Sequence, residues 1–343
     1  MMQRPCIVLV GGFLGAGKTT LILAAARELK ERGMKPAIIL NDQGDTLVDT
    51  RLARQSGLDA GEVTGGCFCC QFDSLVEAIH EVQAQSPDVI FAEPVGSCTD
   101  IAATVVGPLR ESYSGEFRLA PLTVCVDPAR ACELETPGAK PALEFLYRNQ
   151  LAEADLVCYT KSDLYETRAA GPDARYVSAV TGQGVAAWLD EVLFGHIAPG
   201  EHVLEIDYAE YARAEAELAW LNLRATMECE PAISPAMLVG PLLDRIAGSL
   251  DIVHLKAMDQ TATGFLKAAM CNREDEPQIE GTLDASPATA HELLVNLRSC
   301  GEPAVVQSVV EECMADLKGR ILFQQVACFT PAPPKRPGSG KAT

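Results

Sequence analysis

The sequence is short of positive charge and of histidine. Its 343 residues carry 28 lysines and arginines against 47 aspartates and glutamates, which gives a formal net charge of −19 at pH 7. A nucleic-acid partner is not expected, because phosphate backbones are bound by clustered basic side chains. The same charge disfavours anionic membrane surfaces. Only five histidines occur, so metal storage through a histidine-rich stretch is not expected either.

Long hydrophobic runs are also missing. No apolar run reaches the length of a transmembrane helix, and residues 1–5 lead into an apolar segment without the pattern of a signal peptide. These absences predict a cytoplasmic protein with no membrane partner. In that compartment the 13 cysteines are expected to be reduced thiols, metal ligands or core residues, not a disulfide framework.

The most informative stretch that is present is Gly12–Thr20, with the sequence GFLGAGKTT. An apolar run precedes it and helically spaced leucines and alanines follow it, which is the context that a phosphate-binding G-x-x-x-x-G-K-T loop requires. Glycines let successive backbone N–H groups surround phosphate oxygens. Lys18 is predicted to pair with the β- and γ-phosphates, and the Thr19 hydroxyl to ligate Mg²⁺. The predicted nucleotide-binding residues of this loop are Gly12, Gly15, Ala16, Gly17, Lys18, Thr19 and Thr20.

Two further apolar runs, residues 37–40 and 88–92, lead into acidic residues. Asp42 follows the first run and Glu93 the second, with Gly96 three residues further on. Ligands of open parallel sheets bind at the C-terminal ends of the strands. Asp42 and Glu93 are therefore predicted near Mg²⁺, and Gly96 is predicted to let backbone N–H approach the γ-phosphate. No glutamine follows Gly96 to orient the attacking water, so hydrolysis is expected to be slow.

Three cysteines, Cys67, Cys69 and Cys70, lie within four residues after two glycines. Thiolates are soft ligands that select Zn²⁺, Cu⁺ or related ions. Three sulfurs leave a fourth tetrahedral position, which Glu62, water or a partner ligand could fill, and an open position suits a metal that is handed on. The alternative is that the three cysteines pack in a core. Cys98 is open to two interpretations, a fourth thiol near the nucleotide or, as preferred, a packing residue.

The end of the fifth predicted strand selects the base. There the sequence reads Thr160-Lys161-x-Asp163. A carboxylate at Asp163 can accept from the ring N–H and the amino group of guanine, whereas adenine offers no matching donors on that edge. Lys161 is expected to lie over the base. A later Ser178-Ala179 turn is expected to contact the guanine oxygen through the Ala179 N–H.

In this order, the motifs resemble the CobW/HypB/UreG family of phosphate-loop GTPases, and within it the CobW-like branch. The most discriminating elements are Cys-x-Cys-Cys and a Glu93-x-x-Gly96 in place of Asp-x-x-Gly. The resemblance implies GTP-driven handling of metals or cobalamin-type cofactors for client enzymes. Thr160 departs from the usual asparagine of the family, so the amide contact of that residue to the base is lost.

The periodicity of the sequence changes after residue 200. Predicted strands cover residues 218–227, 251–258, 264–271 and 278–283, and predicted helices cover residues 234–249, 288–299 and 305–317. The chain as a whole predicts an α/β fold, with a P-loop NTPase parallel sheet flanked by helices over residues 1–200. A smaller α+β domain follows over residues 201–329, and a disordered tail rich in proline and glycine over residues 330–343.

The leading hypothesis is a GTP-hydrolysing metallochaperone or metallocofactor insertion factor. Lys18, Thr19, Glu93 and Gly96 would form its catalytic set, with GTP or GDP, Mg²⁺ and a transition metal, most plausibly Zn²⁺, as its ligands. The alternative is a GTPase accessory factor for a corrinoid-dependent enzyme such as a methyltransferase, without metal delivery. A non-catalytic adaptor and a small-molecule kinase are further alternatives. The partner would be a client metalloenzyme or corrinoid enzyme, and a homodimer is compatible with the sequence.

Overall fold

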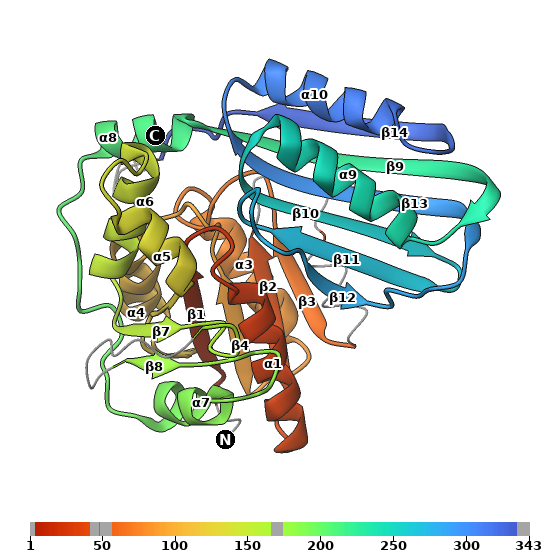
Figure 1. Ribbon diagram of the computed structural model, residues 1–343. Helices are drawn as coiled ribbons and strands as arrows, with labels where there is room; N and C mark the ends of the chain where they lie inside the picture. Colours follow the sequence, from red (N-terminus) through yellow and green to blue (C-terminus); the bar gives the residue numbers. More distant parts are fainter. Residues whose placement is uncertain (1–3, 42–47, 49–56, 166–173, 335–343) are drawn as a thin grey trace. The chain divides into compact units, whose positions relative to one another are not determined.

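The computed structural model describes residues 4–41, 48, 57–165 and 174–334. The chain divides into two compact units, one of residues 1–43, 49–214 and 333–343, the other of residues 44–48 and 215–332. Each unit is built on its own sheet (Figure 1). None of the helices in the described ranges combines the length and apolarity that a membrane crossing needs.

The first unit contains an eight-stranded sheet in the order β3-β2-β4-β1-β6-β7-β8, with β5 beside β1. Its strands are β1 (Cys6–Gly12), β2 (Pro36–Asn41), β3 (Asp59–Val63), β4 (Val89–Glu93), β5 (Arg118–Leu119), β6 (Thr123–Val126), β7 (Leu156–Tyr159) and β8 (Arg175–Tyr176). All of its strand pairs are parallel. Strands β1, β2 and β6 are buried along their whole length, which explains their continuous apolar runs.

The helices of this unit connect its parallel strands or follow the last of them. They are α1 (Lys18–Glu31), α3 (Phe72–Gln83), α4 (Gly107–Tyr113), α5 (Pro128–Glu135), α6 (Pro141–Ala152), α7 (Val185–Phe194) and α8 (Tyr208–Ala216), with a π-helical turn η1 (Ala102–Val106) before α4. Helix α1 packs on α7 and β1, α3 on β2 and β3, and α6 on β1 (Figure 1). The predicted parallel sheet flanked by helices is confirmed. Because the strands are parallel, β1, β2, β4 and β7 all end at the same edge of the sheet.

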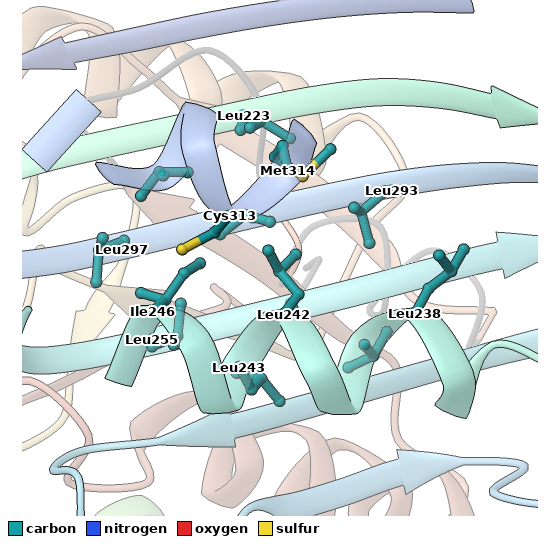
Figure 2. Packing of buried hydrophobic residues seen from close by; sticks show 14 of the residues in the cluster. Leu223, Leu238, Leu242, Leu243, Ile246, Leu255, Leu293, Leu297, Cys313 and Met314 are labelled. Carbon is teal, nitrogen blue, oxygen red and sulfur yellow. The ribbon is translucent and has the colours of Figure 1, made fainter. Parts of the chain in front are cut away.

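The second unit is a six-stranded antiparallel sheet in the order β12-β11-β10-β13-β9-β14. Its elements are β9 (Leu218–Ile233), α9 (Ala236–Ser249), β10 (Asp251–Thr261), β11 (Gly264–Met270), β12 (Gln278–Gly281), β13 (Ala288–Cys300), α10 (Pro303–Ala315) and β14 (Arg320–Phe329). Figure 2 shows Leu238, Leu242 and Ile246 of α9 directed toward the apolar side chains of the sheet. Helix α10 contributes Cys313 and Met314 to the same core. The predicted α+β architecture is thereby confirmed.

The prediction of a helix over residues 288–299 is wrong, because these residues form β13. The Ser286-Pro287 pair resembles a helix start, but β13 lies between β10 and β9 and pairs with both. Residues 293–299 are all buried. Val295 and Leu297 of β13 belong to the apolar core, whereas Asn296 and Arg298 between and after them are buried polar residues. This alternation is typical of a strand, and the helix-start signal of Ser286-Pro287 outweighed it in the prediction. Strand β14 was not predicted.

Leu242 tests the packing of α9 on the sheet, because its side chain is fully buried in this core. Replacing Leu242 by alanine leaves a cavity, so we expect the free energy of unfolding of the second unit to fall by roughly 2–5 kcal/mol. Hydrogen exchange of the amides of β10 and β13 measures this change. Met237, in the same helix and 49% exposed, is the matched control, and Met237→Ala should cost about 0.5 kcal/mol or less. Equal losses for the two variants would contradict the packing described here.

Candidate functional site

The phosphate-binding loop follows β1 and enters α1 at Lys18. Gly17 precedes the helix in the left-handed conformation, with φ 80°, which glycine adopts without steric cost. The buried Lys18 Nζ donates to the carbonyl oxygens of Gly12 at 2.9 Å and Phe13 at 3.3 Å. The ammonium group is therefore held within the loop, where a phosphate would need it.

Glu93, the last residue of β4, meets this loop through its carboxylate. The Thr19 hydroxyl donates to Glu93, at 2.8 Å from Oε2 and 3.1 Å from Oε1. Glu93 Oε1 also lies 3.9 Å from Lys18 Nζ. A hydroxyl oxygen beside a carboxylate fits the preference of Mg²⁺ for oxygen ligands, so these two side chains could hold the ion directly or through water. Asp42, also predicted near Mg²⁺, lies outside the described residues.

Gly96 makes a close backbone approach to the same lysine. A Cβ atom built on Gly96 would lie 3.0 Å from Lys18 Nζ and 2.8 Å from Leu14 Cδ2. A side chain at this position would therefore displace the lysine or the loop. The approach brings the Gly96 backbone beside the group that is predicted to pair with the γ-phosphate, and its contact with that phosphate stays a prediction.

The segment after β7 is tied to the phosphate-binding loop. The Thr160 hydroxyl donates to the Ala16 carbonyl at 2.8 Å, so the residue that departs from the family pattern gains a structural contact. Lys161, with φ 55°, places its Nζ 2.6 Å from Asp127 Oδ2. Asp163 is exposed, as a residue that reads an incoming base must be.

Asp127 is a residue that sequence reasoning missed. It directly follows β6, and its carboxylate accepts from Lys161 Nζ and, at 3.0 Å, from the backbone N–H of Ala129 as the N-cap of α5. The sequence carried a signal, since an aspartate followed by proline after a buried run is a typical helix start. Asp127 fixes the position of Lys161 from the neighbouring strand.

The Ser178-Ala179 turn follows β8. Ser178 is buried, and its Oγ accepts from the backbone N–H of Thr181 at 3.1 Å. The turn is thus closed by its own hydrogen bond and leaves Ala179 partly exposed. A cavity of about 760 Å³ lies beside the neighbouring segment after β7, and its lining includes Tyr147, Tyr159, Thr160, Ser162 and Tyr176. The contact of Ala179 with a base stays a prediction.

The cysteine group lies just before α3. The sulfurs of Cys67, Cys69 and Cys70 are all within 4.8 Å of one another. Cys67 and Cys69 are joined by a disulfide bond, a single pair within one loop and not a disulfide framework, while the other cysteines are free thiols. A metal needs the thiolates, so this bond must be reduced before all three sulfurs can ligate. Glu62 is not part of this group among the described residues, and its ligation stays a prediction.

Asn41, the last residue of β2, holds the cysteine-bearing loop. Its Nδ2 donates to the carbonyl oxygens of Val63 at 2.9 Å and Gly66 at 2.7 Å, and its Oδ1 accepts from the Phe68 N–H at 2.8 Å. Sequence reasoning missed this role of Asn41. One buried side chain thus fixes the backbone on both sides of the first cysteine.

Other cysteines of this unit differ in their surroundings. Cys125 of β6 and Cys158 of β7 are buried neighbours in the sheet. Burial raises the pKa of Cys125 to about 12, so its thiol stays protonated at neutral pH. These two residues are core thiols, whereas Cys69 and Cys70 are partly exposed.

The segment that follows Glu93 is held from α6. Gln150 Nε2 donates to the carbonyl oxygens of Gly96 at 3.0 Å and Cys98 at 2.9 Å. Glu153, directly after α6, accepts from the Ala102 N–H at 2.9 Å and from the Thr99 hydroxyl at 3.2 Å. Burial raises the pKa of Glu153 to about 8, so this carboxyl group carries a proton at neutral pH.

The chain is a GTP-binding protein of the phosphate-loop class. Its parallel sheet carries a lysine and a threonine beside a strand-end carboxylate, together with the Thr-Lys-x-Asp and Ser-Ala turns. The family model described as CobW/HypB/UreG, nucleotide-binding domain, matches residues 6–181. The chain therefore belongs to this family.

Curated relatives are named zinc chaperones. The chain is 32% identical to the zinc chaperone YeiR of Escherichia coli over 160 residues, which are 45% of this chain and 46% of the relative. It is 28% identical to the zinc chaperone YjiA of the same organism, over 48% of this chain and 51% of the relative. The chain is 27% identical to the zinc chaperone CobW of Pseudomonas aeruginosa, over 53% of this chain and 54% of the relative. The matches span about half the length of these relatives.

Two solved structures align with this chain at low sequence identity. The Zn(II)-bound YjiA GTPase of E. coli aligns over 92% of this chain and 100% of its own, with a TM-score of 0.36 and 16% identity. HypB of Helicobacter pylori in complex with nickel aligns over 57% of this chain and 91% of its own, with a TM-score of 0.42 and 16% identity.

Glu153 gives the first unit a pH dependence that can be measured. Its pKa is raised to about 8 in the folded state, against about 4.3 in an unfolded chain. Between these values the folded state binds a proton that the unfolded state has released, so stability falls as the pH rises. The slope approaches about 1.4 kcal/mol per pH unit. We expect Glu153→Gln to flatten this dependence in urea unfolding between pH 5 and 8.

The exposed Glu81 provides the control for this experiment. Glu81→Gln makes the same carboxyl-to-amide change at the surface, and a flattened pH dependence in this variant would contradict the assignment to Glu153. Parallel stability curves for the wild-type protein and Glu153→Gln would show that the Glu153 carboxyl group is ionised in the folded protein.

Proposed function

We propose that this protein is a GTP-hydrolysing metallochaperone or metallocofactor insertion factor, with a zinc-binding cysteine group that responds to the nucleotide state. The observation that carries the proposal is the position of that group. Its three sulfurs lie within 4.8 Å of one another, on a loop that Asn41 holds to the end of β2. The relatives named zinc chaperones support zinc as the cargo.

The nucleotide end of the mechanism uses four residues. Lys18 would neutralise the β- and γ-phosphates, and the Thr19 hydroxyl and the Glu93 carboxylate, now hydrogen-bonded to each other, would hold Mg²⁺. The ion, when bound, supplies charge neutralisation for phosphoryl transfer. Gly96 would donate its backbone N–H to the γ-phosphate. Because no glutamine follows Gly96 in the sequence, turnover without a partner would be slow.

The choice of base would rest on Asp163. Its carboxylate would accept two hydrogen bonds from guanine. Adenine would cover the same carboxylate without offering it donors and would therefore be rejected. Lys161 would cover the base with its aliphatic stem, while its ammonium group pairs with Asp127 at 2.6 Å. The Thr160 hydroxyl, bonded to Ala16, keeps this segment in register with the phosphate-binding loop.

The metal end would consist of Cys67, Cys69 and Cys70 as thiolates, with the remaining position open to water, Glu62 or a client ligand. An open zinc position permits ligand exchange, whereas closed four-ligand sites are structural. Loss of the γ-phosphate would release the segments after Asp42 and Gly96 and weaken the metal site, and the first of these segments lies outside the described residues. The partner would be an apo-metalloenzyme that takes the ion, and a homodimer is a further arrangement that we propose for testing.

The base specificity can be tested by exchanging a carboxylate for an amide. Asp163→Asn should weaken GTP binding by about 100-fold or more, since two charge-assisted hydrogen bonds are lost. The same variant should gain affinity for xanthosine triphosphate, whose carbonyl oxygen replaces the amino group and accepts from the new amide. Calorimetric titration of GTP, ATP and xanthosine triphosphate measures both effects. Equal binding of GTP and ATP by the wild-type protein would contradict the proposed base selection.

The coupling between nucleotide and metal can be tested in reduced protein. We expect one zinc ion per chain, bound more tightly with a non-hydrolysable GTP analogue than with GDP, because a ligand shifts a conformational equilibrium only through differential affinity. Competition with a chromogenic chelator measures both affinities. The triple variant with alanine at positions 67, 69 and 70 should lose zinc and keep GTP.

Two other results would redirect the assignment. Equal zinc affinities in the two nucleotide states would contradict coupling while leaving metal binding intact. No stoichiometric zinc in reduced protein, together with normal GTP binding, would favour an accessory factor for a corrinoid-dependent enzyme without metal delivery.

A further inference from the structure

The proposed metal group has a sulfur neighbour outside its own loop. Cys98 Sγ lies 3.4 Å from Cys69 Sγ, and Cys69 Sγ lies 3.9 Å from Cys70 Sγ. Zinc–sulfur bonds of about 2.3 Å in a tetrahedron separate the sulfurs by about 3.8 Å. Both distances are close to this value, although Cys98 is not within 4.8 Å of all three sulfurs of the group. Reduction of the Cys67–Cys69 disulfide frees two sulfurs to turn toward a common centre.

Side chains from two helices contact the backbone around Cys98 in this conformation. Gln150 binds the Cys98 carbonyl at 2.9 Å, and the backbone N–H of Thr99 donates to the Tyr211 hydroxyl at 3.0 Å. The Cys98 side chain is buried, with 4% of its surface exposed. In this conformation α6 and α8 place Cys98 beside the cysteine-bearing loop.

Asp100 and Tyr208 reinforce this arrangement. Asp100 has φ 66°, a conformation that few residues other than glycine adopt, and its carboxylate accepts a hydrogen bond from the Tyr208 hydroxyl. Burial and this hydrogen bond, together with the nearby charges of Asp100, Cys98 and Cys70, raise the pKa of Tyr208.

Cys98 is also close in sequence to the residue that approaches the phosphate site. Gly96 lies two residues before it, and the Gly96 backbone packs against Leu14 and Lys18. A shift of Gly96 on loss of the γ-phosphate would move the Cys98 sulfur with it. The other three cysteines lie on a separate loop that Asn41 holds.

We infer that Cys98 is the fourth sulfur ligand of the metal and the ligand that the nucleotide state adds or withdraws. The inference rests on the proposed function and makes it more specific. With GTP the ion has four thiolates and is retained. With GDP the Cys98 sulfur withdraws, and the open position is available to a ligand of the client.

X-ray absorption at the zinc edge tests this assignment, because it counts the sulfur atoms around the ion. In reduced, zinc-loaded wild-type protein we expect four sulfurs with the GTP analogue and three sulfurs with one lighter atom with GDP. Cys98→Ala should show three sulfurs in both states. Its zinc affinity with the analogue should fall at least tenfold and become equal to that with GDP.

Cys6→Ala is the matched control, since Cys6 is a buried cysteine at the other end of β1 from the phosphate-binding loop. Its sulfur count and zinc affinity should equal those of the wild-type protein in both nucleotide states. The GTP affinity of each variant shows whether it is folded. The sulfur count in the wild-type protein stands even if Cys98→Ala does not fold.

The outcomes separate the two proposals. Three sulfurs in wild-type protein with both nucleotides, or a tenfold nucleotide effect that persists in Cys98→Ala, would overturn the role of Cys98 and leave the metallochaperone assignment standing. Four sulfurs in both nucleotide states would overturn the withdrawal of Cys98. Failure of the reduced protein to bind zinc would overturn both proposals.

Discussion

The hydrogen bond from the Thr19 hydroxyl to the Glu93 carboxylate joins the two strand ends on which the site depends. It connects the start of α1 to the end of β4, at 2.8 Å, and Lys18 lies within 3.9 Å of the same carboxylate. The parallel pairing of β1 with β4 makes this contact possible, because it brings the C-terminal ends of both strands to one edge. A register shift of one residue in this pairing would turn Glu93 to the opposite face of the sheet.

From this contact two short paths lead to the cysteine group. One path runs along the chain from Glu93 through Gly96 to Cys98, whose sulfur lies 3.4 Å from Cys69. The other runs across the sheet, since Leu40 of β2 pairs with Glu93 and Asn41 follows directly and binds the cysteine-bearing loop. A change at the phosphate site therefore has packed, hydrogen-bonded elements through which to act, which is the physical requirement for coupling.

The parts of this fold that sequence predicts well are those in which local pattern and tertiary role agree. The phosphate-binding loop, the buried strands around it and the amphipathic helices α9 and α10 belong to this class. Residues 288–299 were misassigned because the helix-start signal of Ser286-Pro287 outweighed the alternation of Val295 and Leu297 with polar residues. Asn41 and Asp127 were missed as supports because their partners lie on other strands and loops. Cys98 was left open for the same reason, since its distance from Cys69 depends on how two separate loops fold.

A metal carrier must satisfy two demands that oppose each other, tight retention in transit and release at the client. A site with fixed ligands meets only one of them, since its affinity is the same at both times. An exchangeable ligand on the nucleotide-sensing segment meets both, because its contribution is present in one state and absent in the other. In the proposed mechanism Cys98 would be on such a segment, while Asn41 anchors the cysteine-bearing loop to a strand end. The division between a fixed set of three sulfurs and a movable fourth would let hydrolysis of one GTP change the affinity for the ion without unfolding the site.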